Sequence, residues 1–233
     1  MIFGIMISIY ETKDGSKTLL NTELNETYHS RNGAIQESLH VFLGAGFQDF
    51  TTENPQLLHI SVLEIGFGTG LNALLTLQKC LDNPAISVYY ESLETYPLDY
   101  EQVKDLGYLE QIQDPRLEEY FEKMHQTDWN KPFTICSNFV LHKKNMSLRD
   151  FQSEQMFHIV YFDAFAPNVQ PEMWEIENLR KIKNNMLLKG FFVTYCAKGQ
   201  LKRDLKELGF LVERLSGPPG KREMTRALLS YEL

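Results

Sequence analysis

The chain has 233 residues, of which 43% are hydrophobic and 23% charged, which excludes a wholly disordered, collagen-like or membrane-spanning protein. Its 31 acidic residues outnumber 23 basic ones, and the net charge of −8 excludes a nucleic-acid-binding protein that is basic over its whole surface. A basic patch on one face remains compatible with this charge. The three cysteines lie far apart and form no Cys-x-x-Cys pair, so we expect reduced thiols, no Cys-based zinc site and a cytoplasmic location.

Residues 1–55 form the first of two predicted regions, an N-terminal extension without an alternating strand–helix pattern. The apolar opening Met1–Tyr10 lacks the basic start of a signal peptide. It is also much shorter than the roughly 20 apolar residues that span a bilayer, so no membrane association is expected. We predict instead a strand with Ile5, Ile7 and Ile9 on one face.

Two further elements are predicted in the extension. Asp14 and Gly15 separate two apolar runs, which is typical of a hairpin turn. The apolar spacing of Ala34–Leu43 predicts a helix, and the Gly44-Ala45-Gly46 segment is expected to end it.

Residues 56–233 alternate strand and helix signals. Near-continuous apolar strands separated by helices predict an α/β fold with a mostly parallel sheet that is covered on both faces. The predicted strands are His59–Gly66, Ile86–Glu94, Phe133–Lys143, Phe157–Phe165 and Phe191–Ala197, and the predicted helices are Leu71–Cys80, Tyr100–Leu106 and Ile176–Leu188. Two last strands, Leu211–Leu215 and Thr225–Tyr231, flank a Gly-Pro-Pro-Gly turn and predict an antiparallel hairpin at one sheet edge.

A Gly-rich turn follows the first strand of this region. Alternate glycines permit a sharp turn and a close approach of a ligand to the backbone, and the helix that follows offers unpaired N–H groups. A dinucleotide site usually reads Gly-x-Gly-x-x-Gly, whereas Glu64 precedes the glycines here and favours a cationic ligand, S-adenosylmethionine, over NAD. A tight turn without a ligand is the plainer alternative. The predicted cofactor-binding residues are Glu64, Gly66, Phe67, Gly68, Thr69, Gly70 and Asn72.

Two acids end later strands of the sheet. Glu94, about 20–30 residues beyond the turn, is placed to accept the ribose hydroxyls of an adenosine ligand, while Glu91 points to the opposite face. Asp163 ends the strand that reads His-Ile-Val-Tyr-Phe-Asp and should lie at the same rim. We interpret it as a cofactor contact and as the catalytic group that accepts a hydrogen bond and a proton from an amine nucleophile, although an aspartate after a strand is often a helix cap.

These features together resemble a class I S-adenosylmethionine-dependent methyltransferase with a Rossmann-like fold. Three longer segments are more specific: Asp14–Leu43, Phe162–Trp174 and Gly217–Met224. They resemble the MnmC-like methyltransferases of bacterial tRNA wobble-uridine modification. The resemblance implies methylation of 5-aminomethyl-2-thiouridine to 5-methylaminomethyl-2-thiouridine. Because the chain has no second Gly-rich strand–helix–strand unit, it also implies that separate enzymes supply the aminomethyl substrate.

The resemblance also suggests further site residues. Many relatives carry a Gly-Asp after the third strand whose acid contacts adenine, and Asn145 stands near that place here. An uncharged amide oxygen can still accept a hydrogen bond. The substrate-binding candidates are Tyr28, His29, Arg31, Phe165, Pro167, Lys221 and Arg222, and no cluster with metal-ligand spacing is present in the sequence.

A tRNA substrate requires positive charge in an acidic chain. Residues 198–226 hold eight basic and four acidic residues, a local net charge of +4. Lys221 and Arg222 lie in the predicted hairpin turn, where phosphate contact is expected, and affinity for RNA should then depend on salt. Two alternatives remain open: a methyltransferase for small-molecule amines, and a non-catalytic subunit of a tRNA-modification complex that binds S-adenosylmethionine.

Overall fold

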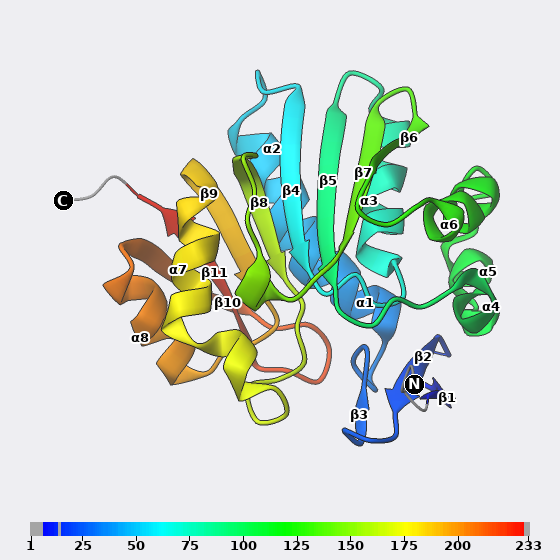
Figure 1. Ribbon diagram of the computed structural model, residues 1–233, viewed down its shortest axis with the longest axis horizontal. Helices are drawn as coiled ribbons and strands as arrows, with labels where there is room; N and C mark the ends of the chain where they lie inside the picture. The colour runs from blue at the N-terminus through cyan, green and yellow to red at the C-terminus, as the bar shows by residue number, and fades with distance from the viewer. Residues whose placement is uncertain (1–6, 14, 231–233) are drawn as a thin grey trace.

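The computed structural model describes residues 7–13 and 15–230 and centres on an eight-stranded sheet (Figure 1). Its order is β10 (Phe210–Ser216), β11 (Glu223–Leu229), β9 (Met186–Thr194), β8 (Phe157–Phe162), β4 (His59–Ile65), β5 (Ser87–Glu94), β7 (Phe139–Asn145) and β6 (Pro132–Cys136). The five strands from β9 to β7 in this order are parallel, whereas β10, β11 and β6 pair antiparallel with their neighbours. The predicted α/β class, the mostly parallel sheet and the C-terminal hairpin are confirmed.

Several element boundaries differ from the prediction, most clearly at two places. The segment Phe133–Lys143 forms two strands, β6 and β7, because a turn at Ser137-Asn138 interrupts it. The Asn138 side chain donates hydrogen bonds of 2.9 Å to the carbonyl oxygens of Cys80 and Ile86, which fixes this turn. The helix predicted over Ile176–Leu188 ends at Asn184, because Met186 already pairs with Phe157 as the first residue of β9.

The N-terminal helix is longer than predicted and passes through both glycines. It consists of α1 (Ala34–Ser38), a π-helical stretch η1 (Leu39–Gln48) and α2 (Asp49–Glu53). The prediction that Gly44–Gly46 ends it is wrong, because these small residues serve packing. A Cβ atom at Gly46 would lie 3.1 Å from both Tyr161 Cε1 and Val193 Cγ2, so the missing side chain lets the helix lie close to the sheet.

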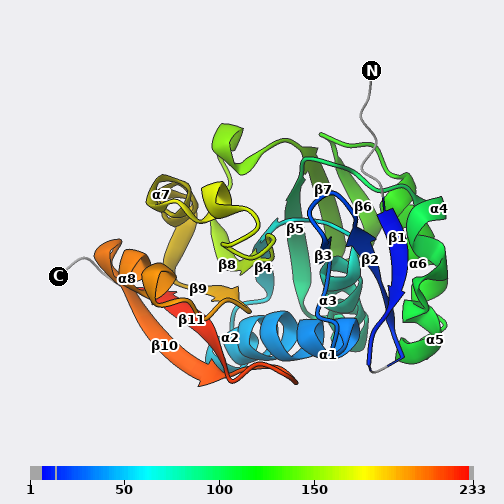
Figure 2. The ribbon, with the colours of Figure 1, turned by 90° about the horizontal axis from the view of Figure 1, so that it is seen from below.

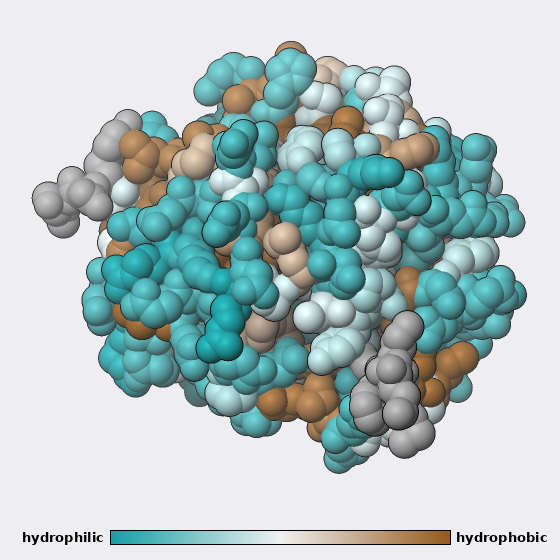
Figure 3. Space-filling view, in the orientation of Figure 1, coloured by the Kyte–Doolittle hydropathy of each residue, from teal (hydrophilic) through white to brown (hydrophobic). Residues whose placement is uncertain are grey.

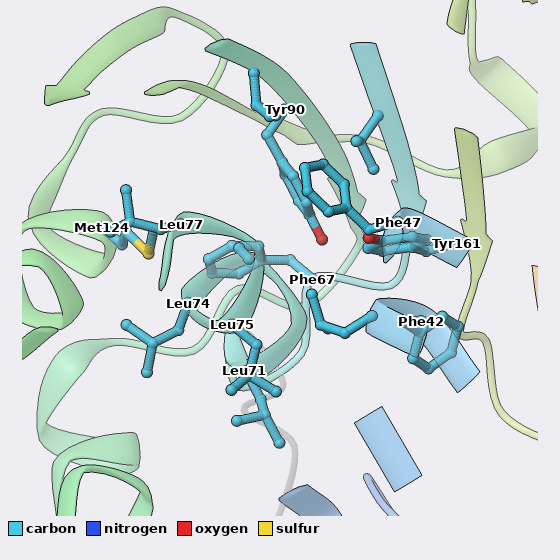
Figure 4. Close-up of a cluster of buried hydrophobic side chains, with 14 of the residues drawn as sticks. Phe42, Phe47, Phe67, Leu71, Leu74, Leu75, Leu77, Tyr90, Met124 and Tyr161 are labelled. Atoms are coloured by element: carbon cyan, nitrogen blue, oxygen red, sulfur yellow. The ribbon is translucent and has the colours of Figure 1, made fainter. Parts of the chain in front are cut away.

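Helices cover the sheet on both faces. The N-terminal helix, α3 (Leu71–Asp82) and α6 (Leu117–Gln126) pack on one face, where Tyr90 and Tyr161 of the sheet meet Phe42, Phe47 and the leucines of α3 (Figure 4). On the opposite face lie α7 (Ile176–Asn184) and α8 (Gly199–Glu207) (Figure 2), whose outer surface is mostly hydrophilic (Figure 3). The shorter helices are α4 (Tyr100–Val103), η2 (Lys104–Leu106), α5 (Tyr108–Ile112), η3 (Leu148–Asp150) and η4 (Pro171–Trp174).

A small antiparallel sheet lies below the ends of β4 and β5 in Figure 1. It contains β1 (Ile7–Glu11), β2 (Lys17–Asn21) and β3 (Glu26–Thr27), so the predicted N-terminal hairpin is confirmed. Ile7 packs against the core whereas Ile9 is 55% exposed; Ile5 and Tyr231 lie outside the described residues. The division at residue 55 stays a prediction, and the hydrophobic core is continuous across it.

The C-terminal hairpin is bound to the N-terminal helix. Arg226 of β11 donates hydrogen bonds to the carboxyl group of Asp49 (2.7 Å) and to the carbonyl oxygen of Ala45 (3.2 Å), and its guanidinium lies over the ring of Phe191. The first and last regions of the chain thus stabilise each other. Within residues 7–13 and 15–230, no helix has the length and apolar composition needed to cross a bilayer.

Candidate active site

A pocket opens at the carboxyl ends of β4, β5 and β8 and is also lined by Asn21 and Tyr28 of the N-terminal extension. It contains about 810 Å³ of space between the atoms, including the part open to solvent. Parallel strands bring their carboxyl ends to one rim, which is where ligands of open α/β sheets bind. Its walls combine the Gly-rich turn, Glu94, Asp163 and apolar side chains such as Met146, Leu148 and Met173.

The turn between β4 and α3 requires its glycines. Gly66, Gly68 and Gly70 have φ angles of 95°, 51° and 75°, in the left-handed region that other residues rarely adopt. A Cβ at Gly66 would lie 2.9 Å from the carbonyl oxygen of Asp163, and one at Gly68 would lie 3.3 Å from the ring of Tyr28. The glycines therefore allow the turn to contact both the β8 loop and the N-terminal extension.

The backbone amides of the turn are already used within the protein. Gly66 and Phe67 donate to the carbonyl oxygen of Leu93 at 3.0 and 3.1 Å. Gly68 donates to the carboxyl group of Glu94 at 2.9 Å, and the other oxygen of Glu94 accepts from Tyr96 N–H at 2.8 Å. A pyrophosphate would need such amides free, so this arrangement disfavours a dinucleotide.

Behind the turn, four side chains form a buried chain of hydrogen bonds. The Asn72 amide donates to Glu64 at 3.1 Å and to Asp163 at 2.8 Å, while Ser92 donates to the other oxygen of Glu64 at 2.7 Å. Glu64 is fully buried, and Asn72 is 2% exposed. The Asn72 amide thus positions the side-chain carboxyl groups of Glu64, on β4, and Asp163, directly after β8.

Burial controls the charge of these acids. Removal from water raises the pKa of Glu64 to about 8, against the lowering effect of hydrogen bonds from Ser92 and Asn72. Burial and the nearby carboxyl groups of Glu37 and Glu64 raise the pKa of Asp163 well above its ordinary value. A carboxyl group with a raised pKa is suited to hold a proton taken from an amine.

Hydrogen bonds hold the loop after Asp163 in place. The Asp163 N–H donates to the carbonyl oxygen of Ile65 at 3.0 Å. The Tyr195 hydroxyl donates to the carbonyl oxygen of Ala164 at 2.8 Å, and the Trp174 indole donates to that of Phe165, also at 2.8 Å. Asp163 is therefore fixed with respect to the Gly-rich turn.

A second pocket adjoins the first. Tyr28 and Phe165 line both, and their rings meet edge to face with centroids 5.3 Å apart, so this pair forms a partition. The second pocket is also lined by Arg31, Glu37 and Lys221. Two adjacent pockets at a fixed carboxyl group can hold the two reactants of a group transfer.

Comparison with known proteins agrees with this geometry. Residues 115–230 match a family described as S-adenosyl-L-methionine-dependent methyltransferase. The chain belongs to this family. A crystal structure of the protein MNMC2 from Aquifex aeolicus superimposes on this methyltransferase with a TM-score of 0.75 at 24% identity, covering 100% of this chain and 73% of the other, which supports the same fold.

Two curated relatives are longer proteins. The tRNA 5-methylaminomethyl-2-thiouridine biosynthesis bifunctional protein MnmC of Leptospira borgpetersenii is 26% identical over 218 residues, which are 89% of this chain and 33% of that protein. MnmC of Idiomarina loihiensis is 28% identical over 216 residues, 88% of this chain and 36% of that protein. The methyltransferase spans about a third of the length of these relatives.

The first pocket fits the cationic donor of this family. Its lining residues, all within the described part of the chain, include no lysine or arginine but do include Glu94 and Asp163. The lining also contains His29, whose pKa burial lowers to about 4, so the imidazole is neutral at pH 7. An acidic pocket without basic groups suits a sulfonium and repels phosphate. Among the described residues, no cluster of three or more His, Cys, Asp or Glu side chains is able to hold a metal ion.

The predicted site residues fall into four groups. The first pocket is lined by Tyr28, His29, Gly66, Phe67, Gly68, Glu94, Asp163 and Phe165. Arg31 and Lys221 line the second pocket. Glu64, Thr69, Gly70 and Asn72 are buried behind the turn, and Asn145, Pro167 and Arg222 line neither pocket. Glu91 lies on the other side of the sheet, paired with Lys144 at 2.8 Å.

Two predicted contacts have other partners in the structure. The Asn145 amide donates to the carbonyl oxygens of Glu94 (2.9 Å) and Thr95 (3.2 Å), so its NH₂ group joins β7 to the end of β5; an adenine contact stays a prediction. Lys221 was expected to contact phosphate from a surface turn. Its ammonium instead pairs with Glu37 and lies 3.9 Å from the ring centroid of Tyr195.

Sequence reasoning missed several pocket residues. Glu37 and Tyr195 lie in the second pocket, and Met146, Leu148 and Met173 in the first. None belongs to the Gly-rich turn or is one of the acids predicted at the strand ends, although Met146 and Tyr195 directly follow β7 and β9. The sequence signal for Glu37 was an acid close to the apolar residues Ala34 and Ile35 of a predicted helix, because a buried acid requires a partner.

Proposed function

We propose that this methyltransferase transfers a methyl group from S-adenosylmethionine to the amine of 5-aminomethyluridine or 5-aminomethyl-2-thiouridine at the wobble position of tRNA. The product is the corresponding 5-methylaminomethyl nucleotide. The main support is the position of Asp163, whose carboxyl group lines the donor pocket beside the second pocket. The name of the MnmC relatives supports this choice of substrate.

The residues around the first pocket bind and orient the donor. When bound, S-adenosylmethionine supplies an electrophilic methyl group on a sulfonium. Glu94, with one oxygen accepting from Gly68 and the other from Tyr96, faces the pocket and is the candidate for the ribose hydroxyls. Met146, Leu148 and Met173 offer apolar walls for adenine. Holding both reactants in line contributes roughly 7–11 kcal/mol to lowering the barrier.

Asp163 orients the amine and removes its proton. As the nitrogen bonds to the methyl carbon, the carbon–sulfur bond breaks and its electron pair stays on sulfur. The nitrogen, now carrying four bonds, releases a proton to the Asp163 carboxylate. The raised pKa of Asp163 makes the carboxylate a stronger base, and such assistance is typically worth about 10²–10⁴-fold in rate.

Exposed arginines near the second pocket are candidates for phosphate contacts. Arg31 and Arg222 are exposed, and Arg222 follows Lys221 in the hairpin turn. Lys202 and Arg226 of the same basic region are already paired with carboxyl groups, at 2.9 Å to Glu223 and 2.7 Å to Asp49. Arg31 and Arg222 are therefore the candidates for phosphate contact near the mouth, where a splayed wobble base would enter.

We place the reaction in the bacterial cytoplasm, with separate enzymes supplying the aminomethyl group. The MnmC relatives favour this function over a small-molecule amine methyltransferase or a non-catalytic subunit that binds S-adenosylmethionine.

The test incubates the protein and radiolabelled S-adenosylmethionine with tRNA from cells that lack the methyl modification. We expect label in the wobble nucleotide after digestion and chromatography, and none with tRNA that is already methylated. Donor binding by calorimetry together with an unlabelled wobble position would refute the proposed substrate.

A further inference from the structure

The second pocket carries a group that the methyl-transfer step does not use. Lys221 reaches into it from the C-terminal hairpin turn, and its side chain is 31% exposed. Its ammonium pairs with Glu37, whose side chain is 6% exposed and whose other oxygen accepts from Ser30 N–H at 3.1 Å. The lysine is therefore held in place by a buried acid.

The surroundings of Lys221 are shaped for a flat ring. Tyr28, Phe165 and Tyr195 contribute aromatic side chains to the pocket. The pocket has about 770 Å³ of space between the atoms, including the part open to solvent. Aromatic side chains stack on nucleobases whatever the base, so they hold a base without identifying it. Identification requires a polar group with fixed hydrogen-bonding character.

Lysine has this character because its ammonium only donates hydrogen bonds. In a 5-substituted uracil, the C4 oxygen accepts hydrogen bonds and neighbours the carbon that bears the aminomethyl group. Cytosine carries an amino group at C4, which donates. Two N–H donors that face each other form no hydrogen bond, so a lysine here favours uracil and rejects cytosine.

The position of the hairpin turn agrees with a direct role. A Cβ at Gly220 would lie 2.1 Å from the side-chain nitrogen of Asn32, so the turn packs closely on the N-terminal extension. Lys221 directly follows this contact. The pocket wall is thus assembled from the N-terminal extension, the loop after Asp163, Tyr195 at the end of β9 and the C-terminal turn.

We propose that the second pocket seats the uracil ring of the acceptor nucleotide and that Lys221 selects it by donating a hydrogen bond to its C4 oxygen. This inference rests on the proposed function. It gives Lys221 the role of a base-selecting residue in place of the phosphate contact expected from the sequence.

The test compares two anticodon stem-loops that differ only in the wobble nucleotide, 5-aminomethyluridine or 5-aminomethylcytidine. The wild-type protein should methylate the uridine form with a kcat/KM at least about 100-fold higher. Lys221→Gln, whose amide both donates and accepts, should reduce this ratio below about tenfold. Lys221→Arg, which only donates, should retain the preference for uridine.

Lys202→Met is the matched control, because Lys202 forms a lysine–glutamate pair next to the same hairpin but lines neither pocket. It should retain the wild-type ratio. Circular dichroism and donor affinity verify that each variant is folded.

Three results would overturn the inference: a wild-type protein that methylates both stem-loops equally, equal ratios in the Gln and Arg variants, or an equal loss on both stem-loops in Lys221→Gln. The last result would indicate a phosphate contact if the slope of log RNA affinity against log salt concentration were also reduced by about 0.7. Failure of the wild-type protein to methylate either stem-loop would instead reject the proposed function, and this inference with it.

Discussion

The side-chain nitrogen of Asn72 lies 2.8 Å from Asp163 Oδ2 and donates a hydrogen bond to it. Asn72 belongs to the helix after the Gly-rich turn, whereas Asp163 follows a strand 91 positions later in the chain. This bond connects the helix that follows the proposed donor-binding turn to the group that we propose as the base for the amine. The bond thereby fixes the position of Asp163 relative to helix α3.

Replacing Asp163 by Asn should reduce turnover and spare donor binding. The amide oxygen can still accept the bond from Asn72, but the side chain no longer accepts a proton. We expect kcat to fall about 10²–10⁴-fold, while the Kd of S-adenosylmethionine, measured by calorimetry, changes less than about threefold. A loss in kcat below about tenfold, or roughly 1.4 kcal/mol, would contradict the assigned role.

Asn72→Ala should shift the pH dependence of the reaction. The bond from Asn72 lowers the pKa of Asp163, so its removal should raise that pKa further. The reaction requires the carboxylate, so the pH at which kcat/KM is half-maximal should move upward. Unfolding free energy in urea should also fall by about 1–3 kcal/mol, because a buried donor is lost. An unchanged pH profile would show that Asn72 does not influence the ionisation of Asp163 on which the reaction depends.

Glu64→Gln should change how stability depends on pH. The pKa of Glu64 is raised from 4.5 to about 8, so the folded protein keeps a proton that the unfolded chain releases. The stability that this group contributes is fully present below about pH 4.5 and is lost as the pH rises toward 8. Each such group changes the unfolding free energy by up to about 1.4 kcal/mol per pH unit in this window.

The variant removes the titrating group, so its unfolding free energy should fall less steeply between pH 5 and 8 than that of the wild-type protein. Urea denaturation at three pH values measures both slopes. Parallel slopes would show that Glu64 ionises in the folded protein as it does in the unfolded chain.

Gly46→Ala should destabilise the protein despite the better helix propensity of alanine. The added Cβ would lie 3.1 Å from Tyr161 and Val193, and overpacking of this kind costs about 1–3 kcal/mol. Gly199→Ala is the control, because its Cβ would meet only the flexible end of Arg203 at 3.4 Å. Thermal denaturation should show a lower Tm for the first variant and an equal or higher Tm for the second.

Tyr28 and Phe165 should be energetically coupled. Their edge-to-face contact joins the N-terminal extension to the loop after Asp163, and such pairs contribute about 0.5–1.5 kcal/mol. A double-mutant cycle with Tyr28→Leu and Phe165→Leu, measured by urea unfolding, should yield a coupling energy in this range. A cycle that is additive within error would mean that the two rings act independently.

The parallel sheet and its rim were predictable because they depend on local signals. Apolar strands, the spaced glycines and the acids at strand ends each have a known position in such a sheet. The sequence could not indicate that the helix passes through Gly44–Gly46, since the reason lies in Tyr161 and Val193, more than 100 positions away. Whether a glycine ends a helix or allows it to pack closely depends on such distant neighbours.

The second pocket was predicted only in part, for a similar reason. Arg31 and Lys221 were expected to meet the substrate, but their positions depend on packing between three separate segments. Charge counting gave the C-terminal region a net positive charge and could not show that Glu37, 184 positions before Lys221, partly neutralises it.

The bonds from Arg226 to Asp49 and Ala45 bridge 177 and 181 positions along the chain. During synthesis, the amphipathic segment Ala34–Glu53 therefore emerges from the ribosome long before the strand that anchors it. Contacts so distant in sequence form slowly because a large loop must close first. Until that strand arrives, part of the apolar surface of this early helix remains exposed, and such transiently exposed surface favours aggregation of incomplete chains.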